Sequence, residues 1–166
     1  MKLIRKTKSQ LLFHLGTSEK LLLCQLLQLY PIIPAAHQKL TKNGTIPDAE
    51  ASQRMLDEAL AEQRAQSRAK VHAFLAEKDR FQSTEHGLNL TLKCPEMEWL
   101  LQTLNDIRVG SWVRLGSPES LEIAVLDETT APHYWAMEVA GHFQMRFLAA
   151  LESRMKSPPR KPGPET

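Results

Sequence analysis

The side chains best suited to chemistry lie close together in one segment, Trp99–Gly116. Asn105, Asp106 and Arg108 place an amide, a carboxylate and a guanidinium within four positions. Large apolar residues surround them on nearly every side, so the segment predicts a central, buried helix. Burying a polar group costs several kcal/mol unless the group is hydrogen-bonded or paired. The sequence therefore predicts that each of these three side chains has a partner.

A second segment offers suitable partners. The stretch Asp48–Lys78 contains no Pro or Gly and is rich in strong helix formers. Its two ends are apolar and its middle is polar, and we predict that Arg64 pairs with Asp106 and Glu62 with Arg108. Three interpretations stay open: an ion-pair network between two helices, the wall of a cleft that receives a ligand or a partner, or an enzyme with Asp106 as general base. No nucleophile, second acid or phosphate-binding loop accompanies Asp106 in the sequence.

The same segment carries a resemblance to a known family. The run Leu104-Asn105-Asp106-x-Arg108, followed by Arg114-Leu115-Gly116, resembles a helix signature of an uncharacterised bacterial family, domain of unknown function twenty-seventeen. The resemblance covers about a third of the chain. It implies a mainly helical cytoplasmic protein without an assigned reaction, and it implies that Asn105, Asp106, Arg108 and Arg114 define the family. Trp112 lies in the same run, and we include it among the candidate partner-binding residues.

Length and composition limit the classes of protein that the chain can be. It has 166 residues, of which 42% are hydrophobic and 24% are charged, so neither a fibrous repeat nor wholesale disorder is expected. Its two cysteines, Cys24 and Cys94, are too few for a disulfide scaffold and match no metal-binding spacing. We expect one domain over residues 1–156, no cofactor and no metal. Residues 157–166 form a Pro-rich basic tail that cannot bury enough apolar surface to order itself.

The amino-terminal segment bears on location. Met1–Cys24 begins with basic residues and has three leucines before Cys24, as in a lipoprotein signal peptide. Polar residues from His14 to Lys20 interrupt its apolar stretch, and Leu23 is too large for a cleavage site. No window is apolar for the ~18 residues that a membrane span needs. We therefore expect a cytoplasmic protein with two reduced thiols.

The fold class follows from the hydrophobic periodicity. Alternation over Leu3–Leu15 predicts a β-hairpin, and alternation over Gly87–Leu92 predicts a strand that joins it in a small antiparallel sheet. The remaining segments favour four to five packed helices, so the fold is mainly α. The expected helices are Ser18–Tyr30, Asp48–Lys78, Pro95–Leu115, a short Ser117–Leu126 and Thr130–Arg154.

Other signals concern the last helix. Glu138 and His142 are four residues apart and share a helix face, but two ligands do not make a metal site. Gly141 lies in mid-helix, as does Gly110 in the preceding helix, and together they predict a close crossing. Because the last helix is mostly apolar, it is either central to the core or pairs with a second copy of the chain.

The sequence shows no catalytic or cofactor-binding motif, and the predicted function rests largely on that observation. We expect a non-catalytic adaptor or regulatory protein that contacts another protein or itself. The alternative is a ligand-binding protein or enzyme with a polar pocket around Asp106 and Arg108. A second alternative is non-specific binding of nucleic acid through the basic termini, where Lys2, Arg5 and Lys161 would contact phosphates without reading bases. The sequence favours a solvated role for those termini.

Overall fold

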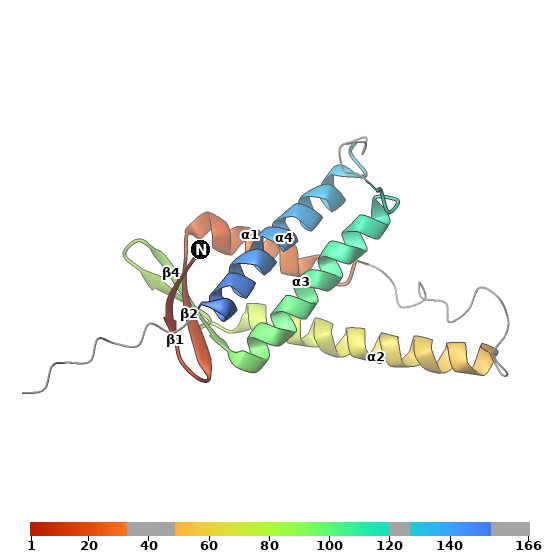
Figure 1. Cartoon of the computed structure of the whole chain (residues 1–166), viewed down its shortest axis with the longest axis horizontal. Coiled ribbons are helices and arrows are strands. Elements are labelled where there is room, and N and C mark those ends of the chain that lie inside the picture. Colours follow the sequence, from red (N-terminus) through yellow and green to blue (C-terminus); the bar gives the residue numbers. More distant parts are fainter. Residues whose placement is uncertain (33–48, 120–126, 154–166) are drawn as a thin grey trace, which may run out of the picture.

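The computed structural model describes residues 1–32, 49–119 and 127–153. Within them lie four helices and a four-stranded antiparallel sheet, with the helices on one side of the sheet (Figure 1). A mainly α fold with a small antiparallel sheet is thus confirmed. The expected tail and most of the expected short helix, residues 120–126, lie outside the described residues, and residues 117–119 are not helical.

The sheet has the strand order β1-β2-β4-β3. The strands β1 (Lys2–Lys6) and β2 (Gln10–Leu15) form the predicted hairpin. Strand β4 (Gly87–Lys93) pairs with β2, so that Phe13 lies opposite Leu90. This pairing confirms that the hairpin and the later strand share one sheet. The sequence did not predict β3 (Phe81–Thr84), the short, mostly exposed partner of β4.

Alternation along β2 and β4 gives the sheet one buried face. Leu11, Phe13 and Leu15 point into the core together with Leu90 and Leu92, and all five are at most 1% exposed. Successive side chains of a strand point to opposite faces, so the residues between these five lie on the other side of the sheet. Helices α1, α3 and α4, described next, pack on this buried face.

Helix α1 (Thr17–Gln28) follows β2 directly. Its first turn is held by Glu19, whose carboxylate accepts a hydrogen bond from the Gly16 N–H at 2.9 Å and pairs with the amino group of Met1. Gly16 therefore occupies the cap position at the amino terminus of α1. Leu23, Leu26 and Leu27 are fully buried.

Helices α3 (Cys94–Arg114) and α4 (Ala131–Glu152) form an antiparallel pair that packs on the sheet (Figure 1). The core is aromatic where α4 meets the sheet. Phe147 lies against Phe13 of β2, with 5.2 Å between the ring centroids, and Phe143 stacks on Phe147. Gly116 follows α3 with φ at +85°, the left-handed conformation expected just after a helix end. The two helices are the structural centre of the fold.

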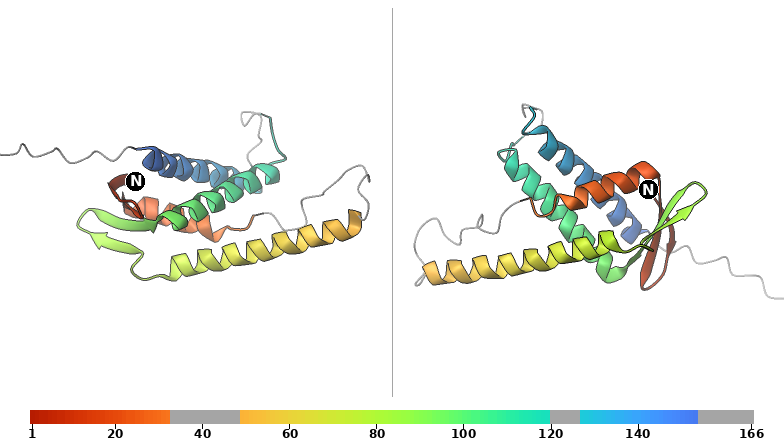
Figure 2. Two further views of the ribbon diagram at one scale, coloured as in Figure 1. Left: turned by 60° about the horizontal axis from the view of Figure 1, so that its bottom comes forward. Right: turned by 180° about the vertical axis from the view of Figure 1, so that it is seen from behind.

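Helix α2 (Ala49–Ala76) is the longest and differs from the rest. Its carboxyl-terminal part contributes Val71 and Phe74 to the core, whereas its amino-terminal half extends away from the other elements (Figures 1 and 2). Met55, on that half, is 72% exposed. None of the four helices in the described residues is both long and apolar enough to cross a membrane.

Candidate functional site

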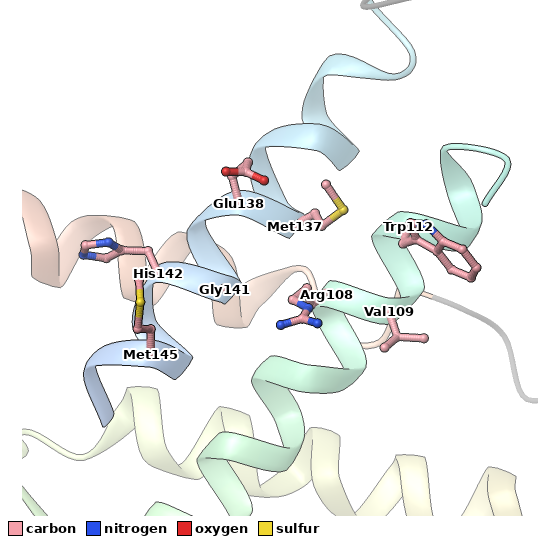
Figure 3. A pocket seen from close by; sticks show the side chains of 8 residues that line it. All are labelled: Arg108, Val109, Trp112, Met137, Glu138, Gly141, His142 and Met145. Carbon is pink, nitrogen blue, oxygen red and sulfur yellow. The ribbon is translucent and has the colours of Figure 1, made fainter. Parts of the chain in front are cut away.

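A groove runs along the outer surface of the α3–α4 pair (Figure 3). It has a volume of about 580 Å³. The lining residues are Arg108, Val109, Trp112, Met137, Glu138, Gly141, His142 and Met145. A second hollow of about 510 Å³ shares Arg108, Gly141 and Met145 with it and extends it toward Asn105 and Leu148. We refer to the two hollows together as the α3–α4 groove.

Helical periodicity explains why these residues line the groove. On α3, Leu100, Leu104 and Ile107 follow the three-four spacing of one face and are completely buried. Arg108 and Trp112 are four positions apart and so lie one above the other on a different face. On α4, the burial of Phe143 and Phe147 likewise leaves Glu138, His142 and Met145 outside.

The groove exposes several large apolar side chains. Trp112 is 40% exposed and Met145 64% exposed, and Val109 and Leu148 are each exposed by more than two fifths. The Trp112 indole is held in place, because its Nε1–H donates a hydrogen bond to the carbonyl oxygen of Pro118 at 3.1 Å. Contiguous exposed apolar residues with a polar rim are typical of protein interaction sites.

Arg108 lies between the two helices, with Val109 and Trp112 along α3 and with His142 and Met145 along α4 (Figure 3). Its Cδ atom lies 3.8 Å from the position that a Cβ would take at Gly141. Its Nη1 donates a long hydrogen bond, 3.4 Å, to Oε1 of Gln144. Among the described residues, no carboxylate forms an ion pair with Arg108. Arg108 therefore has no ion-pair partner there, although Glu138 and Glu152 also line the groove.

The structure does not show the predicted close crossing of Gly110 and Gly141. A Cβ added at Gly141 would meet Arg108, and not Gly110, across the helix pair. Gly110 is itself buried on the inner face of α3. The predicted Gly110–Gly141 crossing is therefore replaced by the passage of the Arg108 side chain over Gly141.

The predicted polar cluster is divided between two sides of α3. Asn105 and Arg108 line the α3–α4 groove, whereas Asp106 acts electrostatically on Arg64 and Tyr30. Residues two positions apart on a helix do not face each other. A single polar pocket around both Asp106 and Arg108 is therefore not what the geometry provides.

The Arg64–Asp106 prediction finds partial support. Partial burial raises the pKa of Asp106, and the nearby Arg64 opposes that shift. The two side chains form no direct ion pair in the part of the chain that the structure describes. Nη1 of Arg64 is buried without a hydrogen-bond partner. Burial also raises the pKa of the neighbouring Tyr30, and the nearby Ser67 side chain opposes that shift.

Two expectations about this cluster are wrong. Asn105, Asp106 and Arg108 are exposed rather than buried, because α3 buries only one face. The predicted Glu62–Arg108 pair does not form: Glu62 accepts a hydrogen bond from Gln66 at 3.2 Å, and Arg108 reaches Gln144 on α4. An exposed polar group needs no protein partner, so the premise that demanded one does not hold.

The last two predicted site residues lie apart from each other. Trp112 is in the α3–α4 groove. Arg114 lies at the end of α3, where its guanidinium donates a 3.4 Å hydrogen bond to the carbonyl oxygen of Ile32 and lines a separate hollow with His133. Arg114 therefore belongs to the contact between α3 and the segment after α1.

Sequence reasoning missed most of the α4 side of the groove, including Met137 and Met145. The signal that could have found them was the shared face of Glu138, His142 and Met145, at spacings of four and three. That face was considered only for metal binding. No hydrogen bond joins Glu138 to His142 in the described structure, and no group of three potential metal ligands occurs among the residues described.

No protein-family model, curated protein or solved structure matches the chain. The resemblance to domain of unknown function twenty-seventeen therefore stays a prediction. What the site can do must be judged from its own geometry, which is a groove along two helices where exposed apolar side chains lie beside Arg108.

Proposed function

We propose that this protein is a non-catalytic cytoplasmic adaptor that binds an acidic amphipathic helix in its α3–α4 groove. The observation that carries the proposal is the position of Arg108, which has no ion-pair partner in the described part of the chain, among exposed Val109, Trp112 and Met145. A groove between two antiparallel helices suits a third helix, which inserts apolar side chains spaced by three and four residues. A carboxylate on that helix would pair with Arg108, with which neither Glu138 nor Glu152 of the groove forms an ion pair.

The kinds of residue present support a protein partner. Trp and Arg are the side chains most often found at the energetic centres of interfaces. Methionine adapts its shape to different partners, and Met137 and Met145 both line the groove. Cys24 and Cys94 are free thiols, in keeping with a reducing compartment.

Fluorescence anisotropy tests this proposal directly. The probe is a stapled, fluorescein-labelled helical peptide with Leu on one face and flanking Glu residues, compared with the same peptide carrying Lys in place of Glu. We expect the acidic peptide to bind and the basic peptide to bind at least about tenfold more weakly, since Arg108 favours a carboxylate. Met145→Glu should weaken binding of the acidic peptide by a similar factor, because it places a charge on the apolar floor.

The matched control is Leu21→Glu on α1, where an equally apolar side chain is 57% exposed outside the groove. That variant should bind the acidic peptide as the unmodified protein does. Equal affinity for the acidic and basic peptides, or equal loss in the Leu21 and Met145 variants, would contradict the proposal.

A further inference from the structure

The face of the sheet opposite the described helices is basic, and we call it the open face. Those helices pack on the other side of the sheet (Figures 1 and 2). The four strands contain no Asp or Glu, and their basic residues are Lys2, Arg5, Lys6 and Lys93. Lys6 belongs to the helix side, where its Nζ donates hydrogen bonds to carbonyl oxygens at the end of α4. The other three are exposed and belong to the open face.

We infer that the open face binds single-stranded nucleic acid, with Lys2, Arg5 and Lys93 in contact with its phosphates. The hollow on this face and the two hollows of the α3–α4 groove have no lining residue in common. The inference is therefore independent of the proposed function, and either can fail without the other.

The strand register spreads the three cations over the open face. Lys2 lies opposite His14 and Lys93 lies opposite Gln10, and Arg5 lies opposite the position midway between those two residues of β2. Residues at every second position of a strand share a face, so all these side chains lie on the same side of the sheet. At about 3.3 Å per residue, the rows of Lys2 and Lys93 are about 13 Å apart along the strands. About two or three nucleotides of an extended strand cover such a length.

The middle of the open face offers contacts for bases. A hollow of about 570 Å³ is lined by His14, Asn89, Ile4 and His86 among others. The imidazole of His14 lies close over Gly87, because a Cβ added there would be 2.8 Å from its Cε1 atom. Ile4 is 53% exposed beside it. Rings stack on bases and side-chain amides hydrogen-bond to base edges, so cations and base contacts occur together on one face.

This arrangement suits a single strand better than other phosphate-containing molecules. One free phosphate needs donors that converge on a point, whereas the cations here are spread along the sheet. A duplex keeps its bases stacked on one another, so it cannot place them on His14. Glu85 also lines the hollow, in the turn between β3 and β4. The register places Glu85 beyond the row of Lys2, so the path from Lys2 to Lys93 leads away from this carboxylate.

Fluorescence anisotropy with the full chain tests the inference. The probe is a fluorescein-labelled oligothymidylate of about twelve nucleotides, within the range of known single-strand site sizes. The same oligonucleotide paired with its complement is the second probe. We expect the single strand to bind more tightly than the duplex. Three phosphate contacts should weaken single-strand binding about twentyfold between about 50 and 200 mM salt, since each contact adds about −0.7 to the logarithmic slope.

Two double variants separate the open face from the rest of the surface. Lys2→Gln/Lys93→Gln should weaken single-strand binding by at least about tenfold at low salt and reduce the loss over the same salt range to about threefold. Arg68→Gln/Lys70→Gln removes the same charge from exposed positions of α2. This second variant should bind the oligonucleotide as the unmodified chain does.

A third substitution tests the base contact. His14→Ala should weaken single-strand binding by at least about fivefold, because it removes a ring on which a base can stack. His14→Phe keeps an aromatic ring and should keep most of the affinity. Equal melting temperatures of these variants and the unmodified chain establish that each one is folded.

Four results would overturn the inference. The first is no binding of the oligonucleotide at low salt. The second is an equal loss of affinity in the two double variants, which would mean that net charge alone acts. The third is a duplex that binds as tightly as the single strand, or a His14→Ala chain that binds as tightly as the unmodified one. The fourth is binding to vesicles that contain phosphatidylserine without binding to the oligonucleotide, which would assign the open face to a lipid surface.

Discussion

At the scale of single residues, Arg80 and Glu96 form the best-defined ion pair of the molecule. The guanidinium donates to both carboxylate oxygens, at 2.9 and 2.7 Å, and also to the carbonyl oxygen of Thr91. It lies 4.7 Å from the ring centroid of Phe74 and so joins α2, β4 and α3. The hydrogen bond with Arg80 is the main reason that the pKa of Glu96 lies below its usual value.

This pair predicts how stability depends on pH. Because the folded-state pKa of Glu96 is below the unfolded value, the stabilisation is complete above the unfolded pKa, about 4.3, and is lost as pH falls through the folded pKa. Glu96→Gln should lower the free energy of unfolding by about 1–3 kcal/mol at pH 7. It should also flatten the decline below pH ~4.3. Urea unfolding across this range measures both effects.

The control for this prediction is Glu98→Gln. Glu98 lies on the same helix, is exposed, and forms no ion pair in the described residues. Its replacement should leave the acid limb of the stability curve unchanged. If both variants behaved alike, the Arg80–Glu96 pair would contribute nothing specific.

Two glycines predict opposite effects of the same substitution. A Cβ at Gly141 would make an ordinary contact with Cδ of Arg108, so Gly141→Ala should stabilise the protein by about 0.5–1 kcal/mol through helix propensity. At Gly87, φ is +147° and a Cβ would lie 2.5 Å from the carbonyl oxygen of Leu15. Gly87→Ala should therefore destabilise by about 2–4 kcal/mol. Thermal melting of both variants distinguishes them, and equal melting temperatures would contradict the packing described for both sites.

At the scale of elements, a single lysine ties the hairpin to the last helix. Nζ of Lys6 on β1 donates hydrogen bonds to the carbonyl oxygens of Ala150, Leu151 and Ser153 at the end of α4. Carbonyls at a helix end lack intrahelical partners and carry partial negative charge, so an ammonium group stabilises them. Lys6 is therefore a structural residue, which leaves fewer basic groups near the amino terminus free to contact phosphates.

This clamp can be tested with a side chain of similar length. Lys6→Met should lower the free energy of unfolding by about 1–2 kcal/mol, since it removes a charged donor from three carbonyls. Lys2→Met on the same strand is the comparison, because Lys2 is exposed and forms no ion pair within the described residues. Equal melting temperatures for the two variants would mean that the clamp does not stabilise the fold.

Most helices and strands could be predicted from the sequence, whereas the residues of the α3–α4 groove could be predicted only in part. Period-two and three-four patterns identified the hairpin, β4 and the long helices, since those patterns depend on local geometry. Strand β3 was missed because it is short and has no buried alternation. The buried side of α3 was misjudged, because a helix with apolar residues all round does not reveal which of them contact solvent. Val109 and Trp112 became groove residues only when α4 was placed beside them.

At the scale of the whole molecule, the fold divides into a packed body and an extended arm. The body consists of the sheet, α1, α3, α4 and the last part of α2, where Val71 and Phe74 enter the core. The arm, residues 49–63, contributes no residue to that core. Local stability follows the number of buried apolar contacts, so the two halves of α2 should open with very different free energies.

Hydrogen exchange of the backbone amides measures this difference. Amides of residues 52–63 should exchange at least about tenfold faster than those of residues 68–76, because only the latter are held by the core. A marginal helix gains protection only from a surface that covers it. Equal exchange rates in the two halves of α2 would show that the arm is held as firmly as the half that enters the core, and would contradict this division of the helix.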